Sequence, residues 1–197
     1  MALNEQLDWT AVGAIVTDRN ALPVPTTVAD AFKLDTGPPS KDLLPAGTLL
    51  YKFNSGPTFR LDWATKTPIP DPPPADYMVS PWWSPTLPYK QDGGLSQRMN
   101  LARLNGVSMR EWGRLTSVIK EDWGSLAYIL QIELKAPVYA WFGRFKGMAR
   151  IGTGTSMRDG GAEKSGGGKN LPGGGTQFYI PNMAFGGYVA TFVYKNI

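Results

Sequence analysis

Proline and glycine divide this chain into short elements, and their placement constrains the fold more than any other feature. Residues 67–88 hold eight of the 17 prolines, and residues 152–175 hold ten of the 23 glycines. Proline interrupts helices and central strands, and glycine weakens both. We therefore expect a stiff, extended surface connection over 67–88 and a long mobile loop over 152–175.

Two helices are predicted between these two regions. The first covers residues 95–104 and ends at the Asn-Gly step that follows, which is a common C-terminal stop. The second begins after Ser108, and Glu111 three residues later completes a capping box with it. We expect this second helix to run to about Asp122.

The remaining regular structure is predicted to be strands. Residues 126–134 alternate large apolar and other side chains with a period of two, which indicates a half-buried strand. Further strands are expected at 46–53, 138–142, 176–180 and 187–194. The sequence therefore predicts an α+β domain over residues 46–197 with a helical pair inserted mid-chain. Prolines interrupt residues 1–45, which we expect to form an N-terminal arm packed on that domain.

The chain contains no cysteine and no histidine. This excludes a disulfide scaffold, thiolate and imidazole metal sites, a cysteine nucleophile and a Ser-His-Asp triad. We predict no metal. Any chemistry must use carboxylates, Lys, Arg, Tyr, hydroxyls, amides or the backbone.

Charge is unevenly distributed along the chain. Residues 1–97 carry a net charge of −3 and residues 98–197 a net charge of +7. A basic C-terminal half favours an anionic ligand, either a phosphate-bearing small molecule or a nucleic acid, and a solvated basic face is the alternative.

The sequence gives no sign of a membrane span or a secretory leader. No stretch reaches the roughly 20 apolar residues that a span needs. The N-terminal residues lack a basic leader and an uninterrupted apolar core, so we expect no cleavable signal peptide.

Two local features suggest a ligand site. Trp82 and Trp83 stand between two Ser-Pro steps, where they serve either as a stacking platform for a flat ring or as core packing. Gln177 follows three glycines at the start of a predicted strand, either at the mouth of the sheet beside a ligand or on the polar face of a plain hairpin. The glycine-rich residues 165–170 do not match a P-loop, because Asn170 stands where that motif needs Ser or Thr.

Three separated pieces of the chain resemble the NAD-hydrolysing domain of the tuberculosis necrotizing toxin family, a branch of the ADP-ribosyltransferase-like bacterial toxins. Residues 45–53 resemble the family's opening Gly-Thr…Asp-Arg-Tyr strand, and residues 77–81 resemble its aromatic-x-Ser-Pro step. Residues 140–143 and 172–178 together resemble its Trp-Phe-Gly…Pro-Gly-Gly-Gly-x-Gln-Tyr signature.

The resemblance implies roles for individual residues. Gln177 matches the essential glutamine of the family. Lys52 stands where the family has an arginine for the cofactor phosphates; it keeps the charge but loses the planar fork. Phe53 replaces a tyrosine, and Arg60 or Arg98 is the candidate for a second phosphate-binding arginine. The other expected cofactor contacts are Ser80, Trp82, Trp141 and Thr176.

The same resemblance implies a fold and an activity. The fold would be an ADP-ribosyltransferase-like split β-sheet core, and the protein an NAD-consuming toxin or effector that cleaves the nicotinamide–ribose bond, an NAD glycohydrolase. The alternatives are a mono-ADP-ribosyltransferase toxin acting on a protein or nucleic-acid target, and a non-enzymatic binding module. Because nicotinamide leaves from a cationic ring, the reaction needs no histidine. An amide does not ionise, so Gln177 would orient ligands rather than act as a base.

Partners and location follow from the resemblance as well. An NAD-draining enzyme calls for a cognate immunity protein in the cell that makes it. We expect export by a specialised secretion system and action in the cytosol of a target cell. A membrane partner is not expected, and a nucleic-acid partner is disfavoured but stays open.

Candidates for a carboxylate role in catalysis are Glu111, Glu133 and Glu163.

Overall fold

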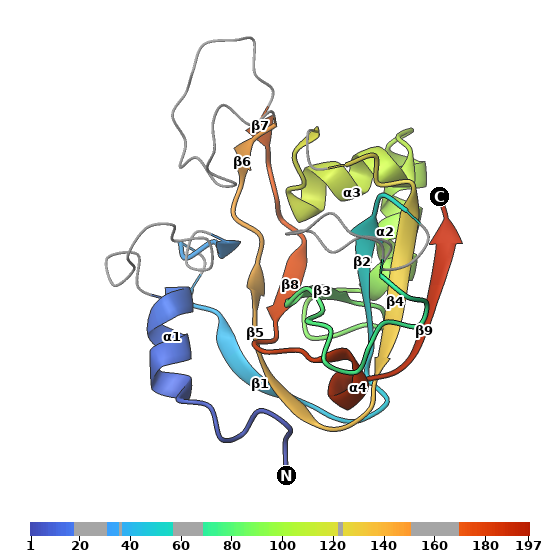
Figure 1. Cartoon of the computed structure of the whole chain (residues 1–197). Helices are drawn as coiled ribbons and strands as arrows, with labels where there is room; N and C mark the ends of the chain where they lie inside the picture. The colour runs from blue at the N-terminus through green and yellow to red at the C-terminus, as the bar shows by residue number, and fades with distance from the viewer. Residues whose placement is uncertain (18–30, 36, 57–68, 122–123, 151–169) are drawn as a thin grey trace.

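The computed structural model describes residues 1–17, 31–35, 37–56, 69–121, 124–150 and 170–197. Seven antiparallel strands form one sheet in the order β1-β5-β8-β3-β2-β4-β9, and β6 and β7 form a separate two-stranded ribbon above it (Figure 1). The strands of the large sheet are β1 (Ser40–Leu44), β2 (Leu49–Asn54), β3 (Trp82–Pro85), β4 (Tyr128–Leu134), β5 (Val138–Arg144), β8 (Thr176–Tyr179) and β9 (Val189–Asn196); the ribbon strands are β6 (Met148–Ala149) and β7 (Asn170–Leu171).

Strand β3 joins two halves of the large sheet. Its first two residues, Trp82 and Trp83, pair with β8. Its last two residues, Ser84 and Pro85, pair with β2. Strands β1, β5 and β8 thus lie on one side of β3, and β2, β4 and β9 lie on the other.

The predicted helical pair is confirmed. Helices α2 (Gly94–Leu104) and α3 (Met109–Ser117) follow β3 and lie together beside the ends of β2 and β4 (Figure 1). The capping box is also confirmed at its N-cap, since the Ser108 hydroxyl accepts a hydrogen bond from the backbone N–H of Glu111 at 3.1 Å.

The predicted length of the second helix was wrong. It ends at Ser117 rather than near Asp122, because Val118 adopts a left-handed conformation with φ of 55°. The Arg114 guanidinium then donates to the carbonyls of Ile119 and Lys120, which holds the chain in its new direction. An early stop matters because it turns residues 118–119 toward the sheet.

The main core lies on one face of the large sheet. It is built by the alternating apolar side chains of β4 and β5 together with residues of β2, β3 and β8, among them Leu50, Trp83, Leu130, Ile132, Ala140, Phe142 and Phe178. A second cluster of Tyr51, Phe53, Leu126 and Ile129 packs on the other face with apolar residues of α2 and α3. Strand β4 therefore buries side chains on both faces, and the prediction of a half-buried strand was too simple.

Part of the predicted N-terminal arm belongs to the large sheet itself. Residues 40–44 form the edge strand β1, paired along its length with β5. Helix α1 (Trp9–Thr17) lies outside this edge (Figure 1), and the side-chain amide of Asn4 donates to the Tyr139 carbonyl at 2.8 Å. The boundary predicted at residue 45 falls at the turn between β1 and β2.

The proline-rich region, the glycine-rich region and the closing strand differ in part from their predictions. Residues 67–88 are more than a surface connection, since they contain β3, and Trp83 is buried. Most of the glycine-rich loop lies outside the described residues, and its end at 170–171 forms β7. The closing strand begins at Val189 rather than 187, because the short helix α4 (Phe185–Tyr188) precedes it.

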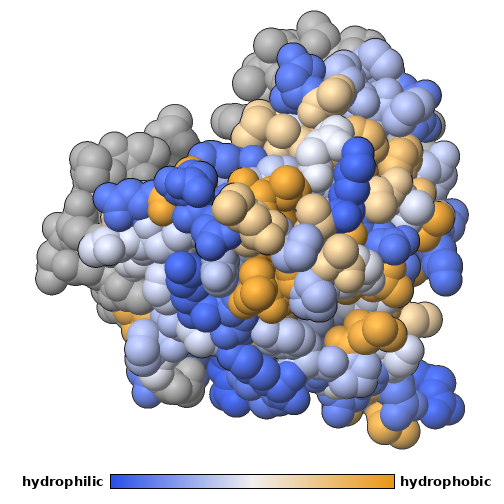
Figure 2. Space-filling model, turned by 90° about the horizontal axis from the view of Figure 1, so that it is seen from below, coloured by the Kyte–Doolittle hydropathy of each residue, from blue (hydrophilic) through white to orange (hydrophobic). Residues whose placement is uncertain are grey.

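Within the described ranges, no helix is long and apolar enough to cross a bilayer. On the lower face of the molecule, hydrophobic side chains form small groups between hydrophilic ones (Figure 2). Such mixing is ordinary for a protein surface and singles out no docking patch there.

Candidate functional site

A pocket opens where β3 passes between β2 and β8. Its volume is about 280 Å³. The last residues of β2 pair with β4 but have no partner on β3, whose pairing with β2 ends at Tyr51. This leaves room for a ligand beside the β2 backbone. Five of the predicted site residues line the pocket: Lys52, Phe53, Ser80, Trp82 and Gln177.

Lys52 supplies the positive charge of this pocket. The side chain is half-buried, and its Nζ lies 5.7 Å from the centre of the Trp83 ring. Burial lowers the pKa of Lys52 from 10.5 to about 8. None of the described lining residues carries a carboxylate, so no anion from this wall neutralises the amine. Lys52 is therefore placed to attract an anionic ligand group.

Gln177 forms the inner wall of the pocket. It lies on β8 opposite Gly143 of β5 and is fully buried. Its Nε2 donates to the Ala31 carbonyl at 2.8 Å, which fixes the amide, and its Oε1 has no hydrogen-bond partner among the described residues. We predicted that Gln177 lies either on the polar face of a hairpin or at the mouth of the sheet, and neither prediction included its burial. Three preceding glycines do not indicate which residues cover the following strand.

The two tryptophans have different surroundings. Trp83 is a core residue, 1% exposed, and its Nε1 donates to the Ser80 carbonyl at 2.7 Å. Trp82 is half-buried and packs against Tyr179, with ring centres 4.8 Å apart. Trp83 therefore matches the core-packing alternative, and both residues line the pocket.

Arg98 and Thr176 lie outside this pocket, in a buried polar network between α2 and β8. The Arg98 guanidinium donates to Asp92 at 2.8 Å, to the Thr176 carbonyl at 3.0 Å and to the Ser117 hydroxyl at 3.1 Å. Burial alone would raise the pKa of Asp92, but Arg98, the Thr176 hydroxyl and the Gly94 N–H together hold it below its usual value. With its donors used in this way, Arg98 stabilises the packing of α2 on the sheet.

Of the last two predicted contacts, Trp141 is not among the residues that line the pocket. Trp141 is half-buried on β5, in a small cluster with Phe32. Arg60 lies outside the described residues.

Several lining residues were not predicted from the sequence. Tyr51 is fully buried in the pocket wall, and burial raises its pKa to about 12. The alternation of β2 places it on the same face as Phe53, and this signal was available. Val118 and Ile119 also line the pocket, but only the early end of α3 brings them there.

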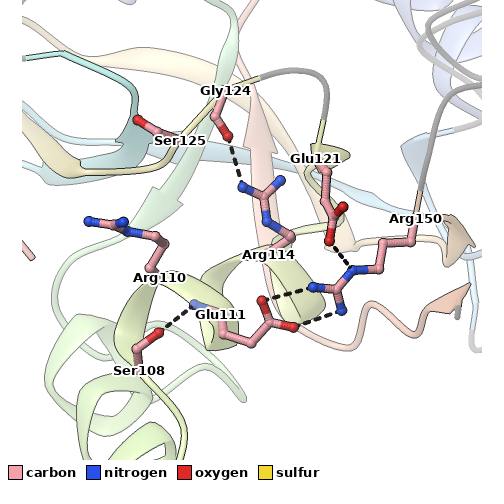
Figure 3. Close-up of a pocket in the computed structure, with 8 residues that line it drawn as sticks. All are labelled: Ser108, Arg110, Glu111, Arg114, Glu121, Gly124, Ser125 and Arg150. Carbon is pink, nitrogen blue, oxygen red and sulfur yellow. Dashed lines mark hydrogen bonds and ion pairs between the residues drawn. The ribbon is translucent and has the colours of Figure 1, made fainter.

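A larger, shallower pocket of about 560 Å³ lies on the outer side of α3 (Figure 3). Its charged side chains are already paired: Arg150 bridges Glu111 and Glu121, and Arg114 donates to the Gly124 carbonyl at 2.8 Å. Arg110 donates to the carbonyl of the C-terminal residue at 3.2 Å. These contacts tie α3 to its neighbours, whereas in the other pocket Gln177 Oε1 has no hydrogen-bond partner among the described residues.

Known proteins do not add to this description. Comparison with family models, with curated proteins and with solved structures gives no match. In the part of the chain that the structure describes, no group of three acidic side chains is placed to hold a metal ion. The resemblance to the toxin family therefore rests on the short motifs alone.

Proposed function

We propose that this protein is an NAD-consuming toxin or effector that hydrolyses the nicotinamide–ribose bond in the Lys52–Gln177 pocket. One observation carries the proposal. Lys52 and Gln177, which come from motifs more than a hundred positions apart in the sequence, line the same pocket, and the Gln177 Oε1 there lacks a partner. A buried acceptor of this kind gains free energy when a ligand donates to it.

The chemistry of the pocket suits a dinucleotide with an anionic linkage. The half-buried Trp82, together with Trp83 and Phe53, gives the pocket an aromatic wall for a flat ring. Lys52 supplies a cation for a phosphate, and the lining hydroxyls of Ser80 and Ser55 supply donors. The cavity is small for a whole dinucleotide, so we infer that it holds the reacting half while the remainder extends along the surface.

Cleavage of this bond makes modest chemical demands. The leaving nicotinamide is already cationic in the substrate and departs neutral, and the ribose passes through an oxocarbenium-like state. The enzyme must orient the ribose and admit water. Gln177 would accept a hydrogen bond from a ribose hydroxyl or from the carboxamide, held in position by its contact with Ala31.

The ADP-ribosyltransferase alternative differs in the acceptor. A transferase needs a docking surface and, in most of that superfamily, a glutamate that activates the acceptor. Glu111 and Glu133 do not line the pocket, and Glu163 lies outside the described residues. The described wall thus favours water as the acceptor, and a binding module without turnover is the remaining alternative.

The split-sheet relationship is also part of the proposal. It is supported by the way β3 changes partner, pairing first with β8 and then with β2, with the pocket at the point of change. An immunity protein, export by a specialised system and action in a target-cell cytosol follow from the proposed activity.

The deciding experiment is incubation of the purified protein with NAD and measurement of free nicotinamide. We expect turnover by the wild type and a loss of about 100-fold or more in Gln177→Met, which keeps the side-chain volume but removes the amide. Gln131→Met is the matched control, because Gln131 is a half-buried strand glutamine outside the pocket.

Two results would contradict the proposal. Absence of nicotinamide release by the folded wild-type protein would leave a binding module. Undiminished release by a folded Gln177→Met variant would remove Gln177 from the mechanism. Because the substitution leaves the Ala31 carbonyl without its donor, at a cost of about 1–3 kcal/mol, thermal unfolding must be recorded alongside.

A further inference from the structure

Three properties of Lys52 indicate a role beyond the proposed reaction. The residue lines the pocket, the described wall carries no carboxylate, and its Nζ lies 5.7 Å from the centre of the Trp83 ring. No ion pair links it to another described residue, in contrast to Lys90, which is bonded to Asp42. A buried lysine amine without an anionic partner loses its proton more easily than a solvated one, and the neutral amine acts as a nucleophile.

Burial increases the share of the neutral amine. With a pKa of about 8, Lys52 is neutral in roughly a quarter of molecules at pH 7.5, whereas an ordinary lysine is neutral in roughly one in a thousand. The neutral amine reacts with carbonyl compounds. The cavity of about 280 Å³ has room for a ring-sized ligand beside the amine.

We propose that Lys52 is a covalent capture site for phosphate-bearing aldehydes. The Lys52 nitrogen attacks the carbonyl carbon, a C=N bond forms, and the carbonyl oxygen leaves as water. The protonated imine keeps a positive charge in the pocket, so the phosphate of the same ligand stays neutralised. The hydroxyls of Ser80 and Ser55, which line the same pocket, provide donors for that phosphate.

The inference extends to the product of the proposed reaction, and this extension rests on the proposed function. Hydrolysis of NAD releases a ribose whose ring opens to an aldehyde at the carbon that carried nicotinamide. This carbonyl would form in the pocket that holds Lys52. Capture of the product would then slow the enzyme as product accumulates.

The test uses pyridoxal 5′-phosphate as the probe, because its labelling requires no NAD turnover. The protein is incubated with the probe at pH 7.5, reduced with borohydride and mapped by peptide mass spectrometry. We expect Lys52 to be labelled at least about tenfold faster than exposed Lys41 and Lys135, and Lys52→Arg to lose that site alone. Equal labelling of all lysines, or labelling that spares Lys52, would overturn the proposal.

A second arm replaces the probe with ADP-ribose and cyanoborohydride. Adduct on Lys52 in the wild type, absent in Lys52→Arg, supports product capture, and an unmodified Lys52 overturns that part. Probe labelling without nicotinamide release from NAD would uphold the capture site while the proposed function fails. Nicotinamide release without probe labelling of Lys52 would overturn the capture site and leave the proposed function in place.

Discussion

We expect Lys52 to make the binding of an anionic ligand depend on pH, in a range where an arginine would stay charged. The family that this chain resembles uses an arginine here, which stays charged at all relevant pH values. Burial lowers the pKa of Lys52 to about 8. Its charge is therefore present below pH 8 and lost as the pH rises through that value.

The size of the effect follows from the fraction of protonated lysine. With a pKa of about 8, Lys52 is charged in about 90% of molecules at pH 7 and in about 10% at pH 9. If only the protonated form pairs with the pyrophosphate, the affinity falls about tenfold over this interval. Tenfold corresponds to about 1.4 kcal/mol, which one charge-assisted contact in a half-buried site can supply.

The assay is titration of a carbocyclic NAD analogue, which is not hydrolysed, at pH 7, 8 and 9. Quenching of tryptophan fluorescence is a suitable signal, because Trp82 and Trp83 line the pocket. Lys52→Arg is the matched variant, and we expect its affinity to be independent of pH over the interval. An equal decline in both proteins, or a flat profile in the wild type, would refute the role of Lys52 in binding the phosphates.

Three further substitutions test the contacts of helices α2 and α3. In Gly113→Ala the added methyl overlaps the Phe53 ring, so we expect a loss of about 1–2 kcal/mol in urea unfolding despite the better helix propensity of alanine. Arg98→Met leaves the buried Asp92 without its cation, and we expect a loss of about 3–5 kcal/mol that shrinks at acid pH as the carboxyl becomes protonated; a loss independent of pH would contradict this. Glu111→Gln breaks one partly exposed ion pair on α3, so the loss should stay below about 1 kcal/mol and NAD turnover should be unchanged; a large loss of turnover would mean that the outer face of α3 takes part in the reaction.

The sequence predicted local structure well where a short-range signal exists. The contact between the Ser108 hydroxyl and the Glu111 N–H marks the start of α3, because the two residues lie within one helical turn. The end of α3 has no such mark. Val118 takes a left-handed conformation that glycine usually provides, and carbonyl contacts from Arg114 support it. Those contacts depend on the folded chain, so a local pattern does not reveal them.

In the candidate site, too, residues in a contiguous motif were predicted from the sequence, and a residue positioned by long-range packing was not. Lys52 and Phe53 were found because the motif around them is contiguous, and they do line one pocket with Gln177. Arg98 was, with Arg60, a candidate for the second phosphate-binding arginine that the resemblance implies. Its partner Asp92 is only six residues away, but their pairing is buried by β8, which comes some 80 positions later. Long-range packing therefore decided its role.

The pocket lies where the short strand β3 changes its pairing partner. Pro81 and Pro85 flank the tryptophans, and β3 is only four residues long. The strand pairs with β8 through Trp82 and Trp83 and with β2 through Ser84 and Pro85. The register between β2 and β3 would place Trp83 opposite Lys52, but the pairing of these two strands ends at Tyr51. The edge of β2 beyond Tyr51 is thus open on this side, and Lys52 and Phe53 there line the pocket. The change of partner along β3 therefore accounts for the position of the pocket that Lys52 and Gln177 line.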